Sequence, residues 1–214
     1  MKNLVIMGAG DCGREIAAFI DDMNKTKKEW NILGFLETPD KLGQKCGNYE
    51  VIGVDDDLMS LYESQDVWAV IAMQEGKIRK KIVESQPDFK QWATIIHPSA
   101  VLIDKVDVGE GTVISPLAAI STATSIGKHC FISLGVTIGH DGQIGDYCSI
   151  MPGAALDGHV SLGERAYIAT NASVLPGVSI GENTLLGVGS VAMEDIRDHV
   201  TAFGNPAKPM MRRR

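Results

Sequence analysis

The chain has few of the features that mark membrane, secreted or nucleic-acid-binding proteins. None of the apolar runs in its 214 residues approaches the roughly 20 residues that a membrane-spanning helix needs. Asp11, Arg14 and Glu15 interrupt the N-terminal stretch too early for a secretory signal peptide. Acidic residues outnumber basic ones by 27 to 20, and the one basic run, 212–214, is predicted to be a tail and not a binding face. The sequence therefore predicts a cytoplasmic protein without a nucleic-acid or membrane partner.

Cysteine is also scarce. The chain has four cysteines, and none of their spacings is that of a zinc site. We expect Cys130 and Cys148 to be reduced residues packed in a core, as is usual for cytoplasmic proteins. A disulfide between them is the alternative.

The sequence does contain a six-residue repeat. Every sixth position from Leu102 to Leu186 carries a branched aliphatic residue. These positions are Leu102, Val108, Ile114, Ile120, Ile126, Ile132, Ile138, Ile144, Ile150, Leu156, Leu162, Ile168, Val174, Ile180 and Leu186. A smaller residue lies two positions before most of them. Glycine follows the aliphatic residue at every third step, at Gly109, Gly127, Gly145, Gly163 and Gly181.

This repeat predicts short parallel strands wound into a three-sided solenoid. The aliphatic and the smaller residue of each hexad are two positions apart, so they share one face of a strand. The slower glycine period indicates three strands in each coil, stacked on the coil before. Helical periods do not fit the pattern. We expect about five coils, which at roughly 4.8 Å each give a prism about 24 Å tall.

Residues 1–94 are predicted to form a separate α/β domain. Apolar strands alternate there with amphipathic helices, which is typical of a small parallel sheet covered by helices. We expect three or four strands, including 4–7, 32–36 and 67–73. One helix follows the first strand and ends near residue 23, and two more are expected at 55–62 and 76–83. Residues 95–192 would form the solenoid. Since the repeat fades after Leu186, 193–214 is predicted to be a C-terminal tail. No flexible linker is evident, so we expect the two domains to pack firmly.

Gly8-x-Gly10-x-x-Gly13 lies between the first predicted strand and the first helix, with the spacing of a dinucleotide-binding fingerprint. Glu37, at the end of the next strand, is where an acid would meet a ribose. The motif could belong to a nicotinamide dehydrogenase, could only form a tight turn, or could bind a phosphate of a nucleotide-linked substrate at the helix N-terminus. We favour the third interpretation, because the sheet is small and the rest of the chain is a solenoid.

His140 and Asp141 interrupt an otherwise plain solenoid surface. One coil later, Gly158 is expected to stack over His140 and His159 over Asp141. Such a pair is most often only solvated surface. A metal site formed by His140, Asp141 and His159 is an alternative, but because no further ligand is evident we predict none.

The motifs, in this order, resemble those of a known family. They are Gly8-x-Gly10-x-x-Gly13, Gly34-Phe35-Leu36-Glu37, Ile95-Ile96-His97-Pro98-Ser99-Ala100, Gly139-His140-Asp141 and Gly204-Asn205-Pro206-Ala207-Lys208. They cover nearly the whole chain and are similar to the sugar acetyltransferases of the hexapeptide-repeat superfamily. That family includes sialic acid O-acetyltransferases and N-acetyltransferases of nucleotide-linked amino sugars. The resemblance implies a Rossmann-like α/β domain with a small parallel sheet, followed by a left-handed parallel β-helix.

The resemblance also implies roles for particular residues. His140 would be the general base, and Asp141 would raise its basicity. The nucleotide-linked sugar would bind at Gly10, Asp11, Cys12, Gly13, Glu37 and Thr38. The co-substrate acetyl-CoA would bind in a groove between neighbours of a homotrimer, near Ser149, Thr170 and Val188. The N–H of Gly158 is our candidate donor to the oxyanion that forms at the thioester.

The predicted activity is therefore direct transfer of an acetyl group to an amino or hydroxyl group of a nucleotide-linked sugar, in bacterial glycan biosynthesis. No serine or cysteine is placed to form an acyl-enzyme. Outward apolar residues at Leu117, Leu134, Leu175 and Val188 favour the homotrimer. The alternatives are a non-catalytic trimeric scaffold with a nucleotide-sensing domain, and an acyltransferase for another small acceptor.

The chain departs from the family pattern at three places on the acceptor side. Cys12 stands where a histidine is frequent, and Glu37-Thr38 stands where paired aspartates are usual. The segment Met73-Gln74-Glu75 precedes Gly76, in place of a small glycine-containing loop. The sequence therefore does not name the sugar or the nucleotide.

Overall fold

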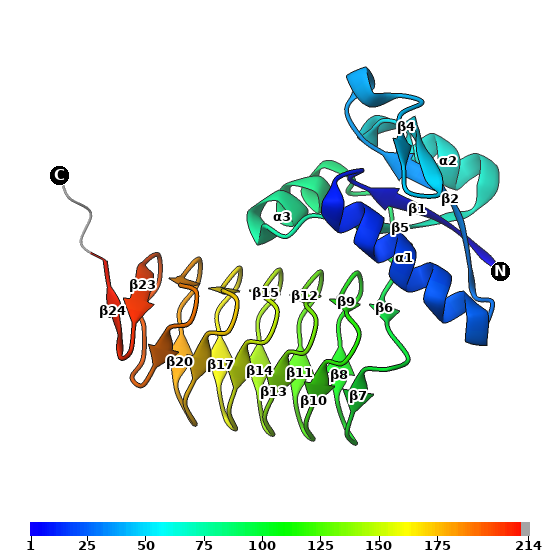
Figure 1. Ribbon diagram of the computed structural model, residues 1–214. Helices are drawn as coiled ribbons and strands as arrows, with labels where there is room; N and C mark the ends of the chain where they lie inside the picture. The colour runs from blue at the N-terminus through cyan, green and yellow to red at the C-terminus, as the bar shows by residue number, and fades with distance from the viewer. Residues whose placement is uncertain (211–214) are drawn as a thin grey trace.

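The computed structural model describes residues 1–210 and contains two parts (Figure 1). A small sheet with helices covers the first coils of a long prism made of stacked short strands. No helix within residues 1–210 combines the length and the apolar character needed to cross a membrane. The basic run 212–214 lies outside the described residues.

The N-terminal part is built on a five-stranded sheet in the order β3-β4-β2-β1-β5. Its strands are β1 Lys2–Met7, β2 Trp30–Leu36, β3 Lys45–Cys46, β4 Tyr49–Gly53 and β5 Val67–Ile71. All neighbours are parallel except β3 and β4, which pair antiparallel. The expected three or four strands are too few. The hairpin of β3 and β4 was missed because β3 has only two residues and β4 buries only one aliphatic side chain, Val51, so neither shows a clear alternation.

Three α-helices and two short 3₁₀ helices complete this part. They are α1 Asp11–Thr26, α2 Leu58–Gln65, α3 Gly76–Ser85, η1 Pro39–Lys41 and η2 Asp55–Asp57. Ile16, Ala17 and Ile20 recur at three- and four-residue spacing on α1 and are buried against the sheet. Burial of a large aliphatic side chain contributes about 1.5–3 kcal/mol. This apolar stripe therefore holds α1 on the sheet and fixes its N-terminus beside the end of β1.

Three sheets form the solenoid, and all their strands pair in parallel except the last two of the third sheet. The first sheet contains β7 Val101–Leu102, β10 Ala119–Ile120, β13 Thr137–Ile138, β16 Ala155–Leu156, β19 Ser173–Val174 and β22 Val191–Ala192. The second sheet contains β8 Asp107–Val108, β11 Ser125–Ile126, β14 Gln143–Ile144, β17 Ser161–Leu162 and β20 Ser179–Ile180. The third sheet contains β6 Ile95–Ile96, β9 Val113–Ile114, β12 Phe131–Ile132, β15 Ser149–Ile150, β18 Tyr167–Ile168, β21 Leu185–Leu186, β23 Thr201–Gly204 and β24 Ala207–Pro209.

Strand register confirms the predicted three strands per coil. Each residue pairs with the residue eighteen positions later, as in Ile120 with Ile138 and Ile132 with Ile150. From Ile114 to Leu186 the aliphatic residues of the repeat are buried in one continuous core. Cys130 and Cys148 are buried there as free thiols. The expectation of reduced, packed cysteines is thus confirmed.

The prism continues beyond the end of the visible repeat. Ile196 pairs with Ile180, and Ala202 on β23 pairs with Leu186. Each of these pairs is separated by sixteen residues instead of eighteen. The last coil is therefore two residues shorter than the others, and the six-residue repeat cannot be followed into it from the sequence. The expectation that the solenoid ends at residue 192 is therefore wrong. Residues 193–209 do not form a free tail, because they continue the coil and close it with the antiparallel pair of β23 and β24.

Arg79 on α3 fastens the two parts together. Its guanidinium is 1% exposed. At 2.6–3.0 Å it donates to the carbonyl oxygens of Met73, Gln74, His129, Tyr147 and Cys148 and to the hydroxyl of Ser149. Gly76 permits this approach, because a Cβ atom there would lie 2.1 Å from the Tyr147 carbonyl oxygen. The firm packing expected between the two parts is confirmed.

Candidate active site

His140 and Asp141 lie at the corner between the first and second sheets, in the turn that joins β13 to β14. Nδ1 of His140 is 2.7 Å from Oδ2 of Asp141. Because an ionised carboxylate only accepts hydrogen bonds, Nδ1 carries the ring proton and Nε2 presents a lone pair. Both side chains are about half exposed, so this lone pair is accessible. The pair has the geometry of a histidine general base held by an acid.

The backbone fixes both members of the pair. The N–H of Asp141 donates to the carbonyl of Thr122 in the coil before, and the carbonyl of His140 accepts from the N–H of His159 in the coil after. Asp141 has a φ of +58°, in the left-handed region that aspartate tolerates better than most residues. The coils above and below therefore determine where the two side chains start.

Gly158 leaves space beside the imidazole. A Cβ atom at this position would lie 2.7 Å from Nε2 of His140, so any side chain would cover the lone pair. Its own N–H makes no hydrogen bond within residues 1–210 and remains available as a donor. His159, the next residue, has Nε2 3.9 Å from Oδ2 of Asp141. The predicted stacking of Gly158 and His159 over the pair is confirmed.

A cavity of about 900 Å³ lies at a different corner, between the second and third sheets and beneath the N-terminal domain. The domain contributes Gly10, Asp11, Cys12, Glu37 and the segment 72–78, and the solenoid contributes Arg165, Tyr167, Asn183, Thr184 and Leu185. The volume falls within the range usual for small-molecule sites. The cavity therefore has room for a ligand that touches both domains.

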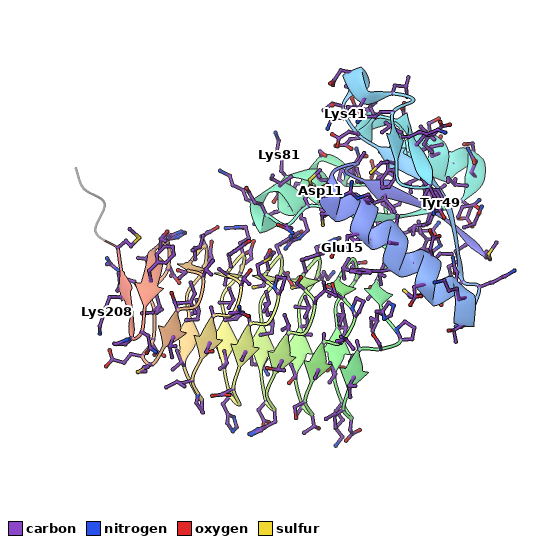
Figure 2. The ribbon with its side chains drawn as sticks, in the orientation of Figure 1. Asp11, Glu15, Lys41, Tyr49, Lys81 and Lys208 are labelled. Carbon is purple, nitrogen blue, oxygen red and sulfur yellow. The ribbon has the colours of Figure 1, made fainter. Side chains whose placement is uncertain are left out.

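The glycine loop opens α1 onto this cavity. Asp11 lies at the N-terminal end of α1, beside α3 (Figure 2). No atom would lie within 4 Å of a Cβ atom on Gly10, whereas one on Gly13 would lie 2.0 Å from the carbonyl oxygen of Gly8. Gly13 thus allows close packing of the turn, and Gly10 leaves the helix N-terminus uncovered. An uncovered N-terminus favours an anionic group.

Glu37 is largely committed to holding this loop. Its carboxylate accepts from the N–H of Ala9 at 3.0 Å and from the N–H of Thr38 at 3.1 Å. Burial by itself would raise the pKa of Glu37. The two N–H groups and the ammonium of Lys41 outweigh that effect and lower the pKa below its ordinary value. Glu37 is therefore an anion next to the glycine loop, with 13% of its side chain exposed.

Cys12 is not set up as a nucleophile. Burial, assisted by the charge of Glu15, raises the pKa of its thiol to about 12. The thiolate is the reactive form, so Cys12 is protonated and unreactive near neutral pH.

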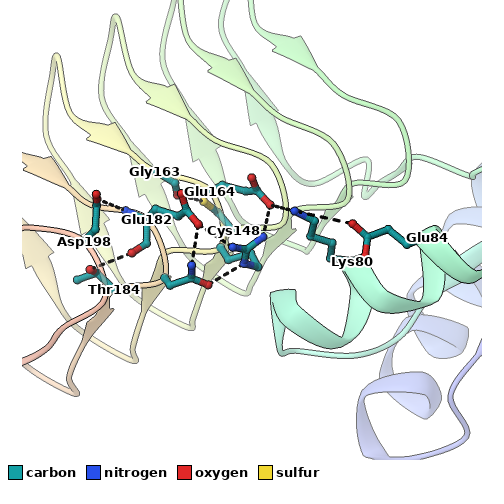
Figure 3. Close-up of polar contacts among 10 residues, drawn as sticks. Lys80, Glu84, Cys148, Gly163, Glu164, Glu182, Thr184 and Asp198 are labelled. Carbon is teal, nitrogen blue, oxygen red and sulfur yellow. Dashed lines mark hydrogen bonds and ion pairs between the residues drawn. The ribbon is translucent and has the colours of Figure 1, made fainter.

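Charged side chains from α3 and the solenoid pair with one another next to Arg165, which lines the cavity (Figure 3). Nζ of Lys80 lies 2.8 Å from Glu164. Arg165 contacts Glu164 and lies 2.7 Å from both Glu182 and Asn183. Since the guanidinium already pairs with two carboxylates, Arg165 shapes the wall of the cavity more than it adds free positive charge.

The structure brings together only some of the predicted site residues. Gly10, Asp11, Cys12 and Glu37 share the cavity, and Thr38 lines a smaller neighbouring pocket. Gly13 is buried and lines neither. Thr170 and Val188 lie at the corner between the third and first sheets, away from His140. Ser149 is 1% exposed, and its hydroxyl bonds to Gln74 and Arg79. We therefore assign Ser149 to the contact between domains and leave it out of the proposed cofactor site.

Sequence reasoning missed the solenoid side of the cavity and the role of Arg79. Tyr167 and Leu185 occupy outward positions of β18 and β21, and the repeat carries information only about inward positions. Arg79 follows Lys77 on a helix with four basic residues, so the sequence offered no signal that this one is buried.

Comparison with known proteins shows which family and which solved structures the chain resembles. Residues 3–86 match the family model of the PglD N-terminal domain. A search of curated protein sequences returned no match. The chain is 31% identical to PerB from Caulobacter crescentus, whose structure is in complex with CoA and GDP-perosamine, with a TM-score of 0.86 over 99% of this chain and 98% of PerB. Two further structures of that perosamine N-acetyltransferase have a histidine replaced, once by asparagine and once by alanine.

Two other solved structures are similar over nearly the whole chain. The acetyltransferase domain of PglB from Neisseria gonorrhoeae, in complex with acetyl coenzyme A, is 29% identical with a TM-score of 0.86, over 98% of this chain and 99% of that domain. WeeI from Acinetobacter baumannii is 24% identical with a TM-score of 0.79, over 98% of this chain and all of that one, and supports the fold alone.

Proposed function

This chain belongs to the sugar acetyltransferase family of the hexapeptide-repeat superfamily, and from this premise we propose that it transfers acetyl from acetyl-CoA to an amino group of a nucleotide-linked sugar. Its fold class is a Rossmann-like domain followed by a left-handed parallel β-helix. The observation that carries the proposal is the accessible lone pair of His140, oriented by Asp141 and left uncovered by Gly158. A non-catalytic scaffold would not need an accessible and oriented histidine lone pair.

The proposed reaction is a direct transfer. The amine attacks the carbonyl carbon of the thioester, and Nε2 of His140 takes the proton that the amine loses. The C–N bond forms and the C–S bond breaks. The departing thiolate of CoA takes the proton from Nε2, which returns His140 to its neutral form. Asp141 stabilises the transient imidazolium through Nδ1–H. The N–H of Gly158 donates to the oxyanion that forms at the thioester.

The acceptor is proposed to bind in the cavity beneath the N-terminal domain. The backbone N–H groups of Gly10, Asp11, Cys12 and Gly13 at the N-terminus of α1 would face its phosphates, while the carboxylate of Asp11 pairs with Arg14. Glu37, with Thr38, would face the nucleoside, because a carboxylate anion repels phosphate. The glycine loop and the size of the cavity support a nucleotide-linked acceptor over a smaller one.

A second copy of the chain is needed to complete this site. The cavity and the histidine lie at different corners of one prism, so a neighbour would supply its own His140. Val101, Leu117 and Val188 are exposed by 55%, 70% and 67%, and apolar strips of this kind support an interface. We propose a homotrimer with acetyl-CoA between neighbours, near Thr170 and Val188. Light scattering should give three times the chain mass of 23.0 kDa, and a monomer at micromolar concentration would exclude the shared site.

The activity is tested by release of CoA from acetyl-CoA in the presence of amino sugars linked to UDP, dTDP, GDP or CMP. At least one acceptor should support release, and His140→Ala should lower turnover by about 10²- to 10⁴-fold. The dissociation constant for acetyl-CoA should change little in that variant. Asp141→Asn should have the milder effect, since the base remains. Absence of release with every acceptor would contradict the proposal.

A further inference from the structure

We propose that His140, Asp141 and His159 form a zinc-binding site whose occupation switches off acetyl transfer. One ligand atom from each side chain lies within 4.8 Å of the other two. Within residues 1–210, no other trio of histidine, cysteine, aspartate or glutamate has this spacing. Imidazole nitrogens and a carboxylate oxygen are ordinary zinc ligands, and three protein ligands plus water make an open tetrahedral site.

The distances require only small movements of side chains. Oδ2 of Asp141 lies 2.7 Å from Nδ1 of His140 and 3.9 Å from Nε2 of His159. Zinc–ligand bonds of about 2.0–2.1 Å in a tetrahedron place neighbouring ligands about 3.3 Å apart, which lies between these two values. The three side chains are 48–64% exposed, so solvent and not packed protein surrounds much of each one.

The main chain beneath these side chains is well fixed. His140 and His159 belong to successive coils joined by a 2.8 Å hydrogen bond between their backbones, and their rings are 5.0 Å apart in an edge-to-face arrangement. Zinc binding would therefore order few groups, which favours affinity. Two imidazoles select zinc over magnesium and calcium, which prefer oxygen ligands.

Zinc in this position would remove the base. When the metal occupies Nδ1 of His140, the single proton of the neutral ring moves from Nδ1 to Nε2. Nε2 then holds an N–H in place of a lone pair and cannot take the proton of the acceptor. The binding part of this inference is independent of the reaction, whereas the inhibition part depends on the proposed function.

Isothermal titration of the full-length chain with zinc chloride tests the binding part. We expect one zinc per chain, and His159→Ala should weaken binding by about tenfold or more, because even second-shell changes cost that much. His199→Ala is the matched control. His199 is also an exposed corner histidine next to an aspartate, Asp198, and should leave zinc binding unchanged. Magnesium chloride should give no binding.

Product formation, followed by chromatography because zinc binds free thiols, tests the inhibition part. Zinc should stop transfer by the unaltered chain at concentrations near its dissociation constant, and His159→Ala should need about tenfold more. A zinc dissociation constant that is unchanged in His159→Ala would overturn the site. Stoichiometric binding without loss of transfer would overturn the switch. If no transfer occurs even without zinc, the proposed function fails, while the titration still decides the site.

Discussion

At the scale of single residues, the proposed chemistry depends on a lone pair that one glycine leaves uncovered. Gly158 lies directly beside Nε2 of His140, and its backbone φ is one that alanine can adopt. Glycine is therefore required at position 158 for the space that it leaves at the imidazole of His140, and not for the freedom of its backbone.

Gly158→Ala should accordingly lower turnover by about 10²-fold or more, approaching the effect of His140→Ala. The melting temperature should stay close to that of the unaltered chain, because the corner is exposed. Steady-state kinetics and thermal unfolding measure the two quantities. Asp157→Ala, at the adjacent exposed position, is the control and should keep its activity. Normal turnover in Gly158→Ala would show that Nε2 is not the proton acceptor.

His129 is a buried histidine with a different role. Its ring is 2% exposed, stacks on Tyr147 with centroids 5.4 Å apart, and has no hydrogen-bond partner at Nδ1 within residues 1–210. Burial lowers its pKa to about 4. Above pH 6.5 both the folded and the unfolded chain hold it neutral. As the pH falls, the unfolded chain takes up the proton first, and stability is lost until the folded pKa is passed.

The loss attributable to His129 between pH 7 and pH 5 should be about 2 kcal/mol in the free energy of unfolding. Urea unfolding at the two pH values measures it. In His129→Gln the difference between the two pH values should shrink by that amount, whatever the variant's stability at pH 7. An unchanged difference would mean that His129 titrates normally in the folded chain.

At the scale of elements, the turn between β1 and α1 assigns different tasks to its glycines. Gly10 has φ −81° and ψ −166°, which valine can adopt, and the space beside it is open. Gly10→Val should therefore fold normally, lose the acceptor and keep acetyl-CoA, since the valine fills only the approach to the helix N-terminus. Thermal shift with each ligand measures this. Gly13→Ala is the contrasting variant and should lose stability, because its Cβ would collide with the carbonyl oxygen of Gly8.

Retention of acceptor binding in Gly10→Val would mean that the glycine loop is only a tight turn. The phosphates of the acceptor would then bind elsewhere in the cavity, where Lys77 is the basic residue that α3 contributes to the lining.

Two side chains of α3 contact the solenoid, one buried and one partly exposed. We expect them to contribute very differently to the free energy of unfolding. Arg79→Met removes six hydrogen bonds from a charged donor, five of them to carbonyl oxygens, and should lower the free energy of unfolding by roughly 3 kcal/mol or more. Lys80→Met on the same helix breaks a partly exposed ion pair with Glu164 and should cost less than about 1 kcal/mol. Denaturant unfolding of both variants measures the contrast. Equal costs would show that α3 is not fastened through Arg79.

At the scale of the whole molecule, the separation of the two corners has a consequence for mixed assemblies. A chain with Gly10→Val lacks a working cavity but keeps its histidine, and a chain with His140→Ala has the reverse defect. If each site combines the cavity of one chain with the histidine of its neighbour, the mixture regains activity.

In randomly mixed trimers about a quarter of the sites should combine two intact parts. The two inactive variants, unfolded together, refolded and assayed, should therefore recover up to that fraction of normal turnover. Each variant refolded alone should stay inactive. Failure of the mixed sample to recover activity, with mixed trimers demonstrated by mass spectrometry, would place each site within one chain.

The sequence by itself determined the prism and the pairing of residues across its coils. Inward aliphatic residues at a strict period can be buried only if strands stack in register, and the same register carries His140 under Gly158 without any knowledge of coordinates. The strand–glycine–helix order likewise predicted the sheet domain and its open helix N-terminus. The local sequence pattern was sufficient to predict these features, because the residues that contact each other are separated by a fixed number of residues along the chain.

Contacts that do not recur at a fixed spacing along the chain were decided only by the tertiary structure. The last coil was hidden because it is two residues shorter than the others, and the two-residue strand β3 left no alternation to read. The placement of the N-terminal domain depends on Arg79 meeting carbonyl oxygens of two coils, which no spacing encodes. That placement puts the cavity at one corner and the histidine at another, because a side chain 50 to 70 residues away along the chain fixes the docking.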